Sequence, residues 1–134
     1  MEKVNPYEKQ VGGVHYKSMP TQPLYFAKAN NVKPEILKVI KYITRNKNRE
    51  EDNAKACHML DLYVENQKMF PKNIFSWFFA ECKMPMQQFI EDNNKVLSWP
   101  QIRALYKLSD VIYCRDKNLA KHVEELKVLI SYIG

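Results

Sequence analysis

The sequence is short of glycine and has no long hydrophobic run. Glycine occurs only at positions 12, 13 and 134, whereas a protein built on many tight hairpins or on glycine-lined phosphate loops usually needs more. No run of about 18 apolar residues is present, and the first ten residues are charged and polar without an apolar signal region. These absences predict a helical protein of the cytoplasm that does not enter the membrane.

Cysteine is also scarce, and its placement excludes two kinds of site. Cys57, Cys82 and Cys114 are odd in number, far apart and form no Cys-x-x-Cys pair. A disulfide framework needs paired cysteines and a structural zinc site needs closely spaced ligands, so neither is indicated. We expect the three side chains to be core thiols in a reducing compartment.

Positive charge is unevenly distributed along the chain. The net charge is +6, and residues 1–50 hold ten Lys and Arg against four Asp and Glu, while residues 51–134 hold eleven of each sign. An excess confined to one part of a chain is typical of a surface that binds an anion, whether nucleotide phosphate, nucleic acid or an acidic partner. A basic face that only keeps the protein in solution is the alternative.

Apolar spacing and helix-end signals predict an all-α fold, a compact bundle of about six helices preceded by an N-terminal arm. The length of 134 residues suits a single domain spanning 1–134, with halves at 11–66 and 70–134. Residues 1–19 lack periodicity and form the arm, and Thr21 is expected to cap a first helix that ends at Asn30. Further helices are expected at 34–45, 50–68, 72–82, 84–93, 99–115 and 118–132.

No standard phosphate-binding or catalytic motif is present. Gly12, Gly13, Lys17 and Ser18 approach a P-loop, but Tyr16 stands where a glycine should precede the lysine, and no strand leads into the loop. His-Glu-x-x-His and Gly-x-Ser-x-Gly patterns are absent as well. Any phosphate chemistry must therefore use another arrangement.

The second expected helix carries cations on one side. Lys38, Lys41 and Arg45 recur at steps of three and four residues, so they project from one face of a helix. Arg binds phosphate oxygens in a bidentate fork and Lys supplies a compact charge, which suits a triphosphate. The alternative is a solvated helix face, partly neutralised by the carboxylates at 50–52.

Two carboxylates on the third expected helix are candidates for a metal site. Asp52 and Asp61 are suited to Mg²⁺, which usually takes one or two carboxylates plus substrate phosphates. In the alternative interpretation, Asp52 with Lys55 and His58 with Asp61 are ordinary surface pairs, each worth about 0.2–0.5 kcal/mol.

The arm adds polar residues that suit a nucleotide. His15 beside Tyr16 is suited to stacking on a base or binding phosphate, although a lone His in a loop is more often a plain hydrogen-bonding residue. The expected nucleotide- and phosphate-binding residues are His15, Tyr16, Lys17, Gln22, Lys38, Tyr42 and Lys47.

At this point the chain resembles a known family over about residues 11–66. The segments that carry the resemblance are Gly13-Val14-His15-Tyr16-Lys17, Gln22-Pro23, Ile40-Lys41-Tyr42-Ile43-x-Arg45, Glu51-Asp52-x-x-Lys55-Ala56 and Leu60-Asp61. They are similar, in the same order, to a phage domain of unknown function that is found in the P-loop-less nucleotide kinase of a short-tailed coliphage. The chain departs from the family at Leu37-Lys38, where Gly-Asn is common.

The resemblance implies a role in phage nucleotide metabolism. The implied reaction is that of a P-loop-independent nucleoside monophosphate kinase, which moves the γ-phosphoryl group of ATP to a deoxynucleoside monophosphate with ATP and Mg²⁺ as cofactors. Such transfer depends mainly on positioning and charge neutralisation, which clustered cations supply. On this hypothesis Lys41, Arg45, Asp52 and Lys55 are catalytic, and Asp52 and Asp61 hold the metal.

Two other functions remain open. An all-α nucleoside triphosphate pyrophosphohydrolase needs about four carboxylates in spaced pairs, for which this stretch offers only Glu50, Glu51, Asp52 and Asp61. The other is a non-catalytic phage protein that binds nucleotide, nucleic acid or a host protein, although no recognised DNA-binding motif is present. Nucleotides are thus the first expected partners and nucleic acid the second.

Apolar residues beyond the needs of one small core predict a homo-oligomer. The stretch Trp77-Phe78-Phe79 leaves no polar face in the helix expected at 72–82, which indicates core burial or a subunit contact. The helix expected at 118–132 is similarly apolar.

Overall fold

The computed structural model describes residues 5–6, 18–70, 83–114 and 117–134, and these contain six α-helices and no strand. The all-α prediction is therefore confirmed. The helix expected at 72–82 and Cys82 lie outside the described residues. The helices are α1 (Pro23–Asn30), α2 (Pro34–Thr44), α3 (Arg49–Met69), α5 (Met86–Asp92), α6 (Trp99–Tyr113) and α7 (Leu119–Ser131). None of these helices has the length and apolar character needed to cross a membrane.

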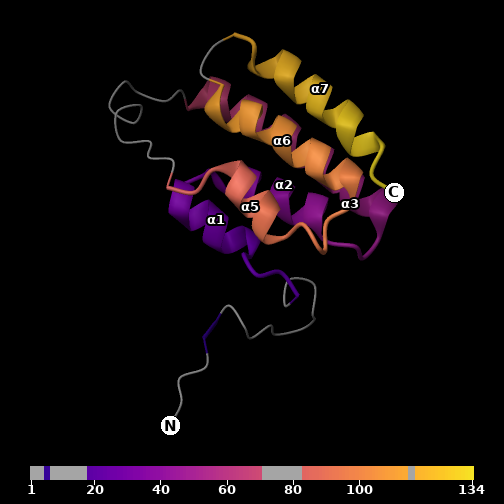
Figure 1. Cartoon of the computed structure of the whole chain (residues 1–134). Coiled ribbons are helices and arrows are strands. Elements are labelled where there is room, and N and C mark those ends of the chain that lie inside the picture. The colour runs from indigo at the N-terminus through magenta and orange to yellow at the C-terminus, as the bar shows by residue number, and fades with distance from the viewer. Residues whose placement is uncertain (1–4, 7–17, 71–82, 115–116) are drawn as a thin grey trace.

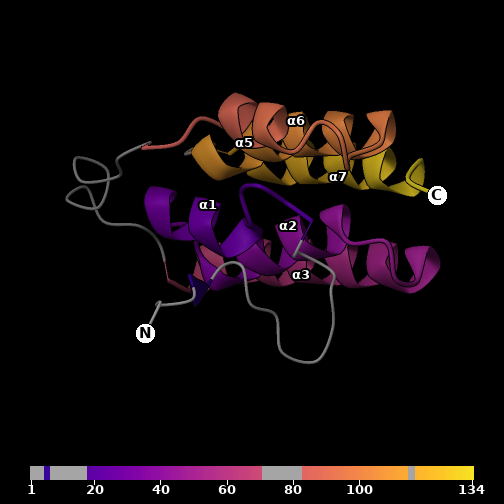
Figure 2. The same cartoon turned by 60° about the horizontal axis from the view of Figure 1, so that its bottom comes forward.

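The helices are arranged in two layers. Figure 2 shows α1, α2 and α3 in one layer and α5, α6 and α7 in the other, and Figure 1 shows the same helices from a second direction. α2 and α3 form a hairpin joined by the short turn 45–48. The chain after α7 returns to the start of α3, where the Asn53 side-chain amide donates to the carbonyl of Ile133 at 2.8 Å. This contact joins the end of one layer to the other.

Local capping signals determine where two of the longer helices begin. The Asn48 side chain caps α3 by accepting a hydrogen bond from the backbone N–H of Glu51 at 3.3 Å. At α6, Ser98 and Gln101 form a reciprocal capping box in which the Ser98 N–H donates to the Gln101 side chain at 2.7 Å. Each bond satisfies a backbone N–H that a helix start otherwise leaves without a partner.

The prediction that Thr21 caps α1 is wrong. Gln22 is the N-cap residue, it makes no side-chain capping bond, and a proline occupies the first turn. The Thr21 hydroxyl instead donates to the Asp92 carboxylate at 2.7 Å, and its backbone N–H donates to the Asn93 side chain at 3.3 Å. Thr21 therefore joins the start of α1 to the end of α5, a tertiary contact that local signals do not reveal.

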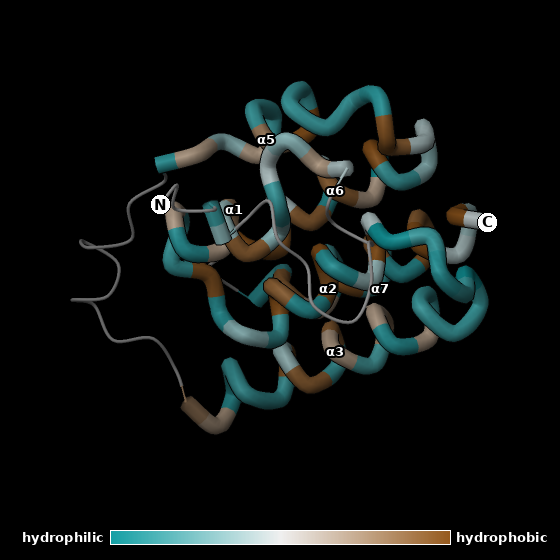
Figure 3. Tube along the Cα trace, turned by 90° about the horizontal axis from the view of Figure 1, so that it is seen from below, coloured by the Kyte–Doolittle hydropathy of each residue, from teal (hydrophilic) through white to brown (hydrophobic). Residues whose placement is uncertain are grey.

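The core lies between the two layers and is almost entirely apolar. In Figure 3, hydrophobic and hydrophilic segments alternate along α2 and α3, as expected for helices with one buried face. The fully buried aromatic rings Phe26 and Phe89 join α1 to α5, with ring centroids 5.2 Å apart. The buried side chains of the four longest helices include Ile36, Val39, Ile40, Ile43, Leu60, Tyr63, Leu105, Leu108, Val123, Leu126 and Ile130.

Gln101 is one of the buried polar side chains that bond across the two layers. Gln101 of α6 is 1% exposed, and its amide nitrogen donates to the carbonyl of Ile43 at 2.9 Å and to the Asn46 side chain at 3.2 Å. The carbonyl of Ile43 lies in the last turn of α2. Carbonyls in the last turn of a helix receive no hydrogen bond from within the helix. By donating to one of them, Gln101 stabilises the end of α2 and also holds α6 over the turn.

A matched pair of leucine substitutions on α3 tests this core. Leu60 is fully buried and Leu62 is 38% exposed on the same helix. Leu60→Ala removes packed methyl groups and should lower the free energy of unfolding by about 2–5 kcal/mol. Leu62→Ala should change it by less than about 1 kcal/mol. Urea unfolding followed by circular dichroism measures both values, and equal losses would contradict the assigned core face.

Candidate functional site

The polar residues singled out by the sequence collect mainly on the outer side of the α2–α3 hairpin. We call this surface the α2–α3 basic face, and it comprises Lys38, Lys41, Tyr42, Arg45 and Lys55. The apolar positions of α2 point the other way, into the core. Lys38 is exposed, while the other four side chains are half-buried. The hairpin therefore presents four cations and one aromatic ring on one surface.

Arg45 is anchored by a carboxylate and is partly buried. Its Nε and Nη2 atoms both donate to Oδ1 of Asp52, at 2.9 Å and 2.7 Å. The second Asp52 oxygen accepts the backbone N–H of Asn48 at 3.4 Å. The Asp52 side chain is 1% exposed and that of Arg45 is 19% exposed. This ion pair joins the residue after α2 to the first turn of α3.

The environment of Asp52 keeps its carboxylate ionised. Burial on its own would raise the pKa of Asp52, but the hydrogen bonds and charge of Arg45, the Asn48 N–H and the nearby Arg49 together hold that pKa below its ordinary value. The carboxylate thus remains charged throughout the neutral range. Both of its oxygens are engaged within the chain, so Asp52 acts first as a structural anchor.

Arg49 closes the same turn from the other side. Its guanidinium donates to the carbonyls of Tyr42 at 2.5 Å and of Arg45 at 2.7 Å, and its Nε donates to the Asn53 side chain at 2.9 Å. Burial lowers the pKa of Arg49, with Asp52 opposing and Arg45 adding to that effect. An arginine remains protonated at neutral pH despite such a shift, so a positive charge lies against the carbonyl end of α2.

Tyr42 brings two cations close together on the surface. The Arg45 guanidinium lies 4.8 Å from the centre of the Tyr42 ring, and the Lys55 ammonium lies 5.9 Å from it. Aromatic faces attract cations, which offsets part of the repulsion between the two charges. Lys55 also pairs with Glu51 at 2.6 Å, and this hydrogen bond raises the pKa of Lys55. The arrangement leaves a preorganised cluster of positive charge beside an exposed carboxylate.

The structure places all four expected catalytic residues on one hairpin, but it separates the two aspartates expected to hold the metal. Lys41, Arg45, Asp52 and Lys55 belong to one hairpin, as the sequence predicted. Asp61 does not join them. It lies nine residues beyond Asp52, which is about two and a half helical turns and so the opposite side of α3. Its carboxylate forms an ion pair with Lys127 of α7.

The described residues do not fit a magnesium site built by the protein alone. Asp52 is buried against Arg45, and Asp61 faces α7. Across the described part of the chain, no group of three or more His, Cys, Asp or Glu side chains is placed to hold a metal. The two aspartates expected to bind Mg²⁺ therefore do not converge on one point.

The remaining expected nucleotide-binding residues lie elsewhere. Gln22 is the N-cap residue of α1 and lies outside the hairpin. The arm residues His15, Tyr16 and Lys17 lie outside the described residues, so their expected approach to the hairpin stays a prediction. Lys47 lies in the turn between α2 and α3.

Lys47 lines a surface depression at the end of the hairpin. The depression has a volume of about 450 Å³ and lies where the α2–α3 turn, the start of α6 and the residues after α7 meet. Its lining residues are Asn46, Lys47, Arg49, Ser98, Pro100, Ile133 and Gly134. A volume of this size is within the range of small-molecule sites, and Lys47 supplies an exposed cation there.

Several residues that shape the site are absent from the sequence-based prediction. Arg49, Asn53 and Lys127 all form the bonds described above but were not selected. The spacing of Asn48 and Glu51, a capping residue followed three positions later by Glu, is a signal that identifies the start of α3. No local signal identifies Lys127, because its partner is 66 residues away in the sequence.

Comparison of the chain with protein-family models, with curated proteins and with solved structures finds no match.

The buried ion pair gives a direct test of how the hairpin is held. Asp52→Asn preserves size but leaves the Arg45 guanidinium without its carboxylate, and should lower the free energy of unfolding by about 2–3 kcal/mol at neutral pH. Glu51→Gln, one residue away in an exposed ion pair, should produce a much smaller loss. Urea unfolding of the three proteins measures both effects.

The stability loss caused by Asp52→Asn should depend on pH. The pKa of Asp52 is lowered in the folded protein, so the pair's contribution is complete above the ordinary pKa near 4 and is lost as the pH falls through the lowered value. The stability difference between the wild type and Asp52→Asn should therefore shrink below about pH 4. A difference that stays constant down to pH 2 would contradict the assignment of the ion pair.

Proposed function

We propose that the protein binds nucleotide phosphates on the α2–α3 basic face and acts as a P-loop-independent nucleoside monophosphate kinase in phage nucleotide metabolism. The observation that carries the proposal is the grouping of Lys55 and the anchored Arg45 at the Tyr42 ring, on the hairpin that also carries Lys38 and Lys41. Four cations against the two carboxylates Glu51 and Asp52 leave an excess of positive charge on this surface. A nucleotide polyphosphate is an anion of complementary charge.

The reaction type is supported by the resemblance and by the chemistry of phosphoryl transfer. The segments Lys41-Tyr42, Arg45, Glu51-Asp52 and Lys55-Ala56 belong to the stretch that resembles the phage kinase domain. Phosphoryl transfer needs little covalent chemistry from a protein, because positioning and neutralisation of the transferring group supply most of the rate. Lys41 and Lys55 are the side chains we assign to neutralisation, and Arg45 positions the turn.

Magnesium would reach such a site bound to the phosphates of ATP, because the described residues offer no converging carboxylates for it. A Mg²⁺ ion usually keeps several waters and takes much of its coordination from substrate phosphates. We therefore assign ATP, Mg²⁺ and a deoxynucleoside monophosphate to the protein as ligands, and the cytoplasm of the host cell as the place of the reaction.

The binding step can be tested separately from the chemistry. Lys41→Ala should weaken ATP binding about tenfold, because it removes one charged phosphate contact worth about 1.4 kcal/mol. Lys121→Ala removes an exposed lysine of α7, in the other layer, and should leave the affinity unchanged. Isothermal titration calorimetry without Mg²⁺ measures both. Equal affinities for the two variants would exclude the α2–α3 basic face as the site.

Product analysis then identifies the reaction. Incubation with ATP, Mg²⁺ and each deoxynucleoside monophosphate should yield ADP and the corresponding diphosphate, and Lys55→Ala should reduce that yield. Pyrophosphate released from a nucleoside triphosphate alone would instead indicate a pyrophosphohydrolase. Duplex DNA binding that weakens steeply with salt and is not competed by free nucleotides would indicate a nucleic-acid-binding protein.

A further inference from the structure

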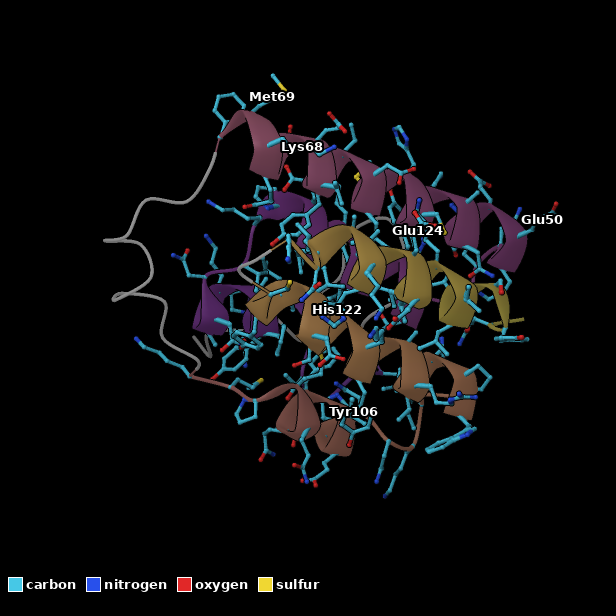
Figure 4. All side chains as sticks on the ribbon, turned by 90° about the horizontal axis from the view of Figure 1, so that it is seen from above. Glu50, Lys68, Met69, Tyr106, His122 and Glu124 are labelled. Atoms are coloured by element: carbon cyan, nitrogen blue, oxygen red, sulfur yellow. The ribbon has the colours of Figure 1, made fainter. Side chains whose placement is uncertain are left out.

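The outward face of α6 carries a line of aromatic side chains that the core does not use. Trp99, Tyr106 and Tyr113 are 68%, 46% and 39% exposed and follow one another at seven-residue steps. Seven residues make about two helical turns, so the three rings lie in one row along the helix. Figure 4 shows Tyr106 on the side of α6 away from α7. The buried face of α6 lies on the opposite side of the helix.

Charged residues alternate with the rings along this row. Arg103 lies between Trp99 and Tyr106, and Asp110 lies between Tyr106 and Tyr113. Both charged side chains belong to exposed positions. The order along the helix is therefore aromatic, cation, aromatic, anion, aromatic. We call these five residues the α6 stripe.

We propose that the α6 stripe is a homodimer interface, in which the α6 helices of two copies of this chain pair antiparallel about a two-fold axis near Tyr106. In that pairing Trp99 faces Tyr113 of the partner subunit, and Tyr106 faces Tyr106 of the partner subunit. Arg103 lies one residue, measured along the helix, from the position directly opposite Asp110 of the partner subunit. The stripe is thus complementary to itself, which is what a two-fold interface requires.

Charge decides the direction of the pairing. A parallel arrangement would set Arg103 against the same arginine of the second copy, and Asp110 against the same aspartate. Like charges placed directly opposite disfavour an interface, whereas the antiparallel arrangement forms two opposite-charge pairs. Among the described residues, Asp110 forms an ion pair with Lys107 alone, at 3.6 Å, and the Lys107 ammonium also binds Glu125 of α7. The Asp110 carboxylate is therefore available to a partner arginine.

The aromatic residues supply the apolar part of the interface. Exposed Trp and Tyr side chains offer large, rigid contact areas, and such residues are enriched at protein interfaces. A single pair of helices buries less than the roughly 800 Å² per partner of a standard interface. The dimer should therefore depend on protein concentration.

Charge reversal on the stripe gives a specific test. Arg103→Asp alone places two carboxylates opposite each other at both ends of the interface, and Asp110→Arg alone places two cations there. Each single variant should have a dimer dissociation constant raised at least about tenfold. An equimolar mixture of the two variants should restore the dimer, because both charge pairs are then complementary. Sedimentation velocity over a range of concentrations measures the mass, which for the wild type should rise from 15.9 kDa towards about twice that value.

Three controls keep the outcome unambiguous. Lys121→Asp reverses an exposed charge on α7 and should leave the wild-type association unchanged. Circular dichroism of every variant should match the wild type, since the substituted positions are exposed. A wild type that stays monomeric at the highest concentration would overturn the proposal, and so would a dimer that neither reversal weakens.

Discussion

The Arg45–Asp52 ion pair is the interaction on which the α2–α3 hairpin depends. A carboxylate that is 1% exposed is costly to desolvate unless a cation and hydrogen-bond donors surround it, and Arg45 and the Asn48 N–H provide both. Because Asp52 is in the first turn of α3 and Arg45 directly follows α2, the pair fixes where one helix ends relative to the start of the next. Arg49 and Gln101 then bind the carbonyls that the end of α2 leaves open. The turn 45–48 thus forms a polar hydrogen-bond network within an apolar bundle, and Gln101 connects this network to the second layer.

Most of the helices could be predicted because their signals are local. Pro34, Asn48 and Ser98 each precede or begin a helix, and the apolar positions that follow them recur at helical spacing. Thr21 was misassigned because the preference of threonine for helix starts is only a tendency. A contact with Asp92, 71 residues away, determines its position instead. Local propensity therefore predicts the elements well, while the tertiary partners of polar residues have to be taken from the structure.

The sequence predicted the region of the site, but it did not predict the roles of the individual residues. The spacing of Lys38, Lys41 and Arg45 suggested three equivalent cations on one helix face. That argument assumes a helix continuing through residue 45, whereas α2 ends at Thr44 and Arg45 has an extended backbone. Its side chain consequently turns towards Asp52 and is held by that carboxylate, while its guanidinium stays beside the Tyr42 ring. Similarly, Asp52 and Asp61 look like equivalent carboxylates in the sequence, yet one is buried against α2 and the other pairs with α7. Spacing along one helix gives only the approximate direction of each side chain, and contacts with neighbouring helices determine which side chains remain accessible to a ligand.

The two proposed surfaces lie on different layers, and this separation has an electrostatic consequence. The α2–α3 basic face belongs to one layer and the α6 stripe to the other (Figure 2). Pairing through α6 would place the two basic faces at opposite ends of the dimer, separated by four helical layers, or on the order of 40 Å at about 10 Å per layer. Charges that far apart in solution are screened, since the Debye length is about 8 Å at physiological ionic strength. Self-association through α6 therefore does not bring the two α2–α3 basic faces together, because the cations of each face lie in the other layer of the subunit. The same geometry leaves each basic face open to an anion, so dimer formation and nucleotide binding do not compete for one surface.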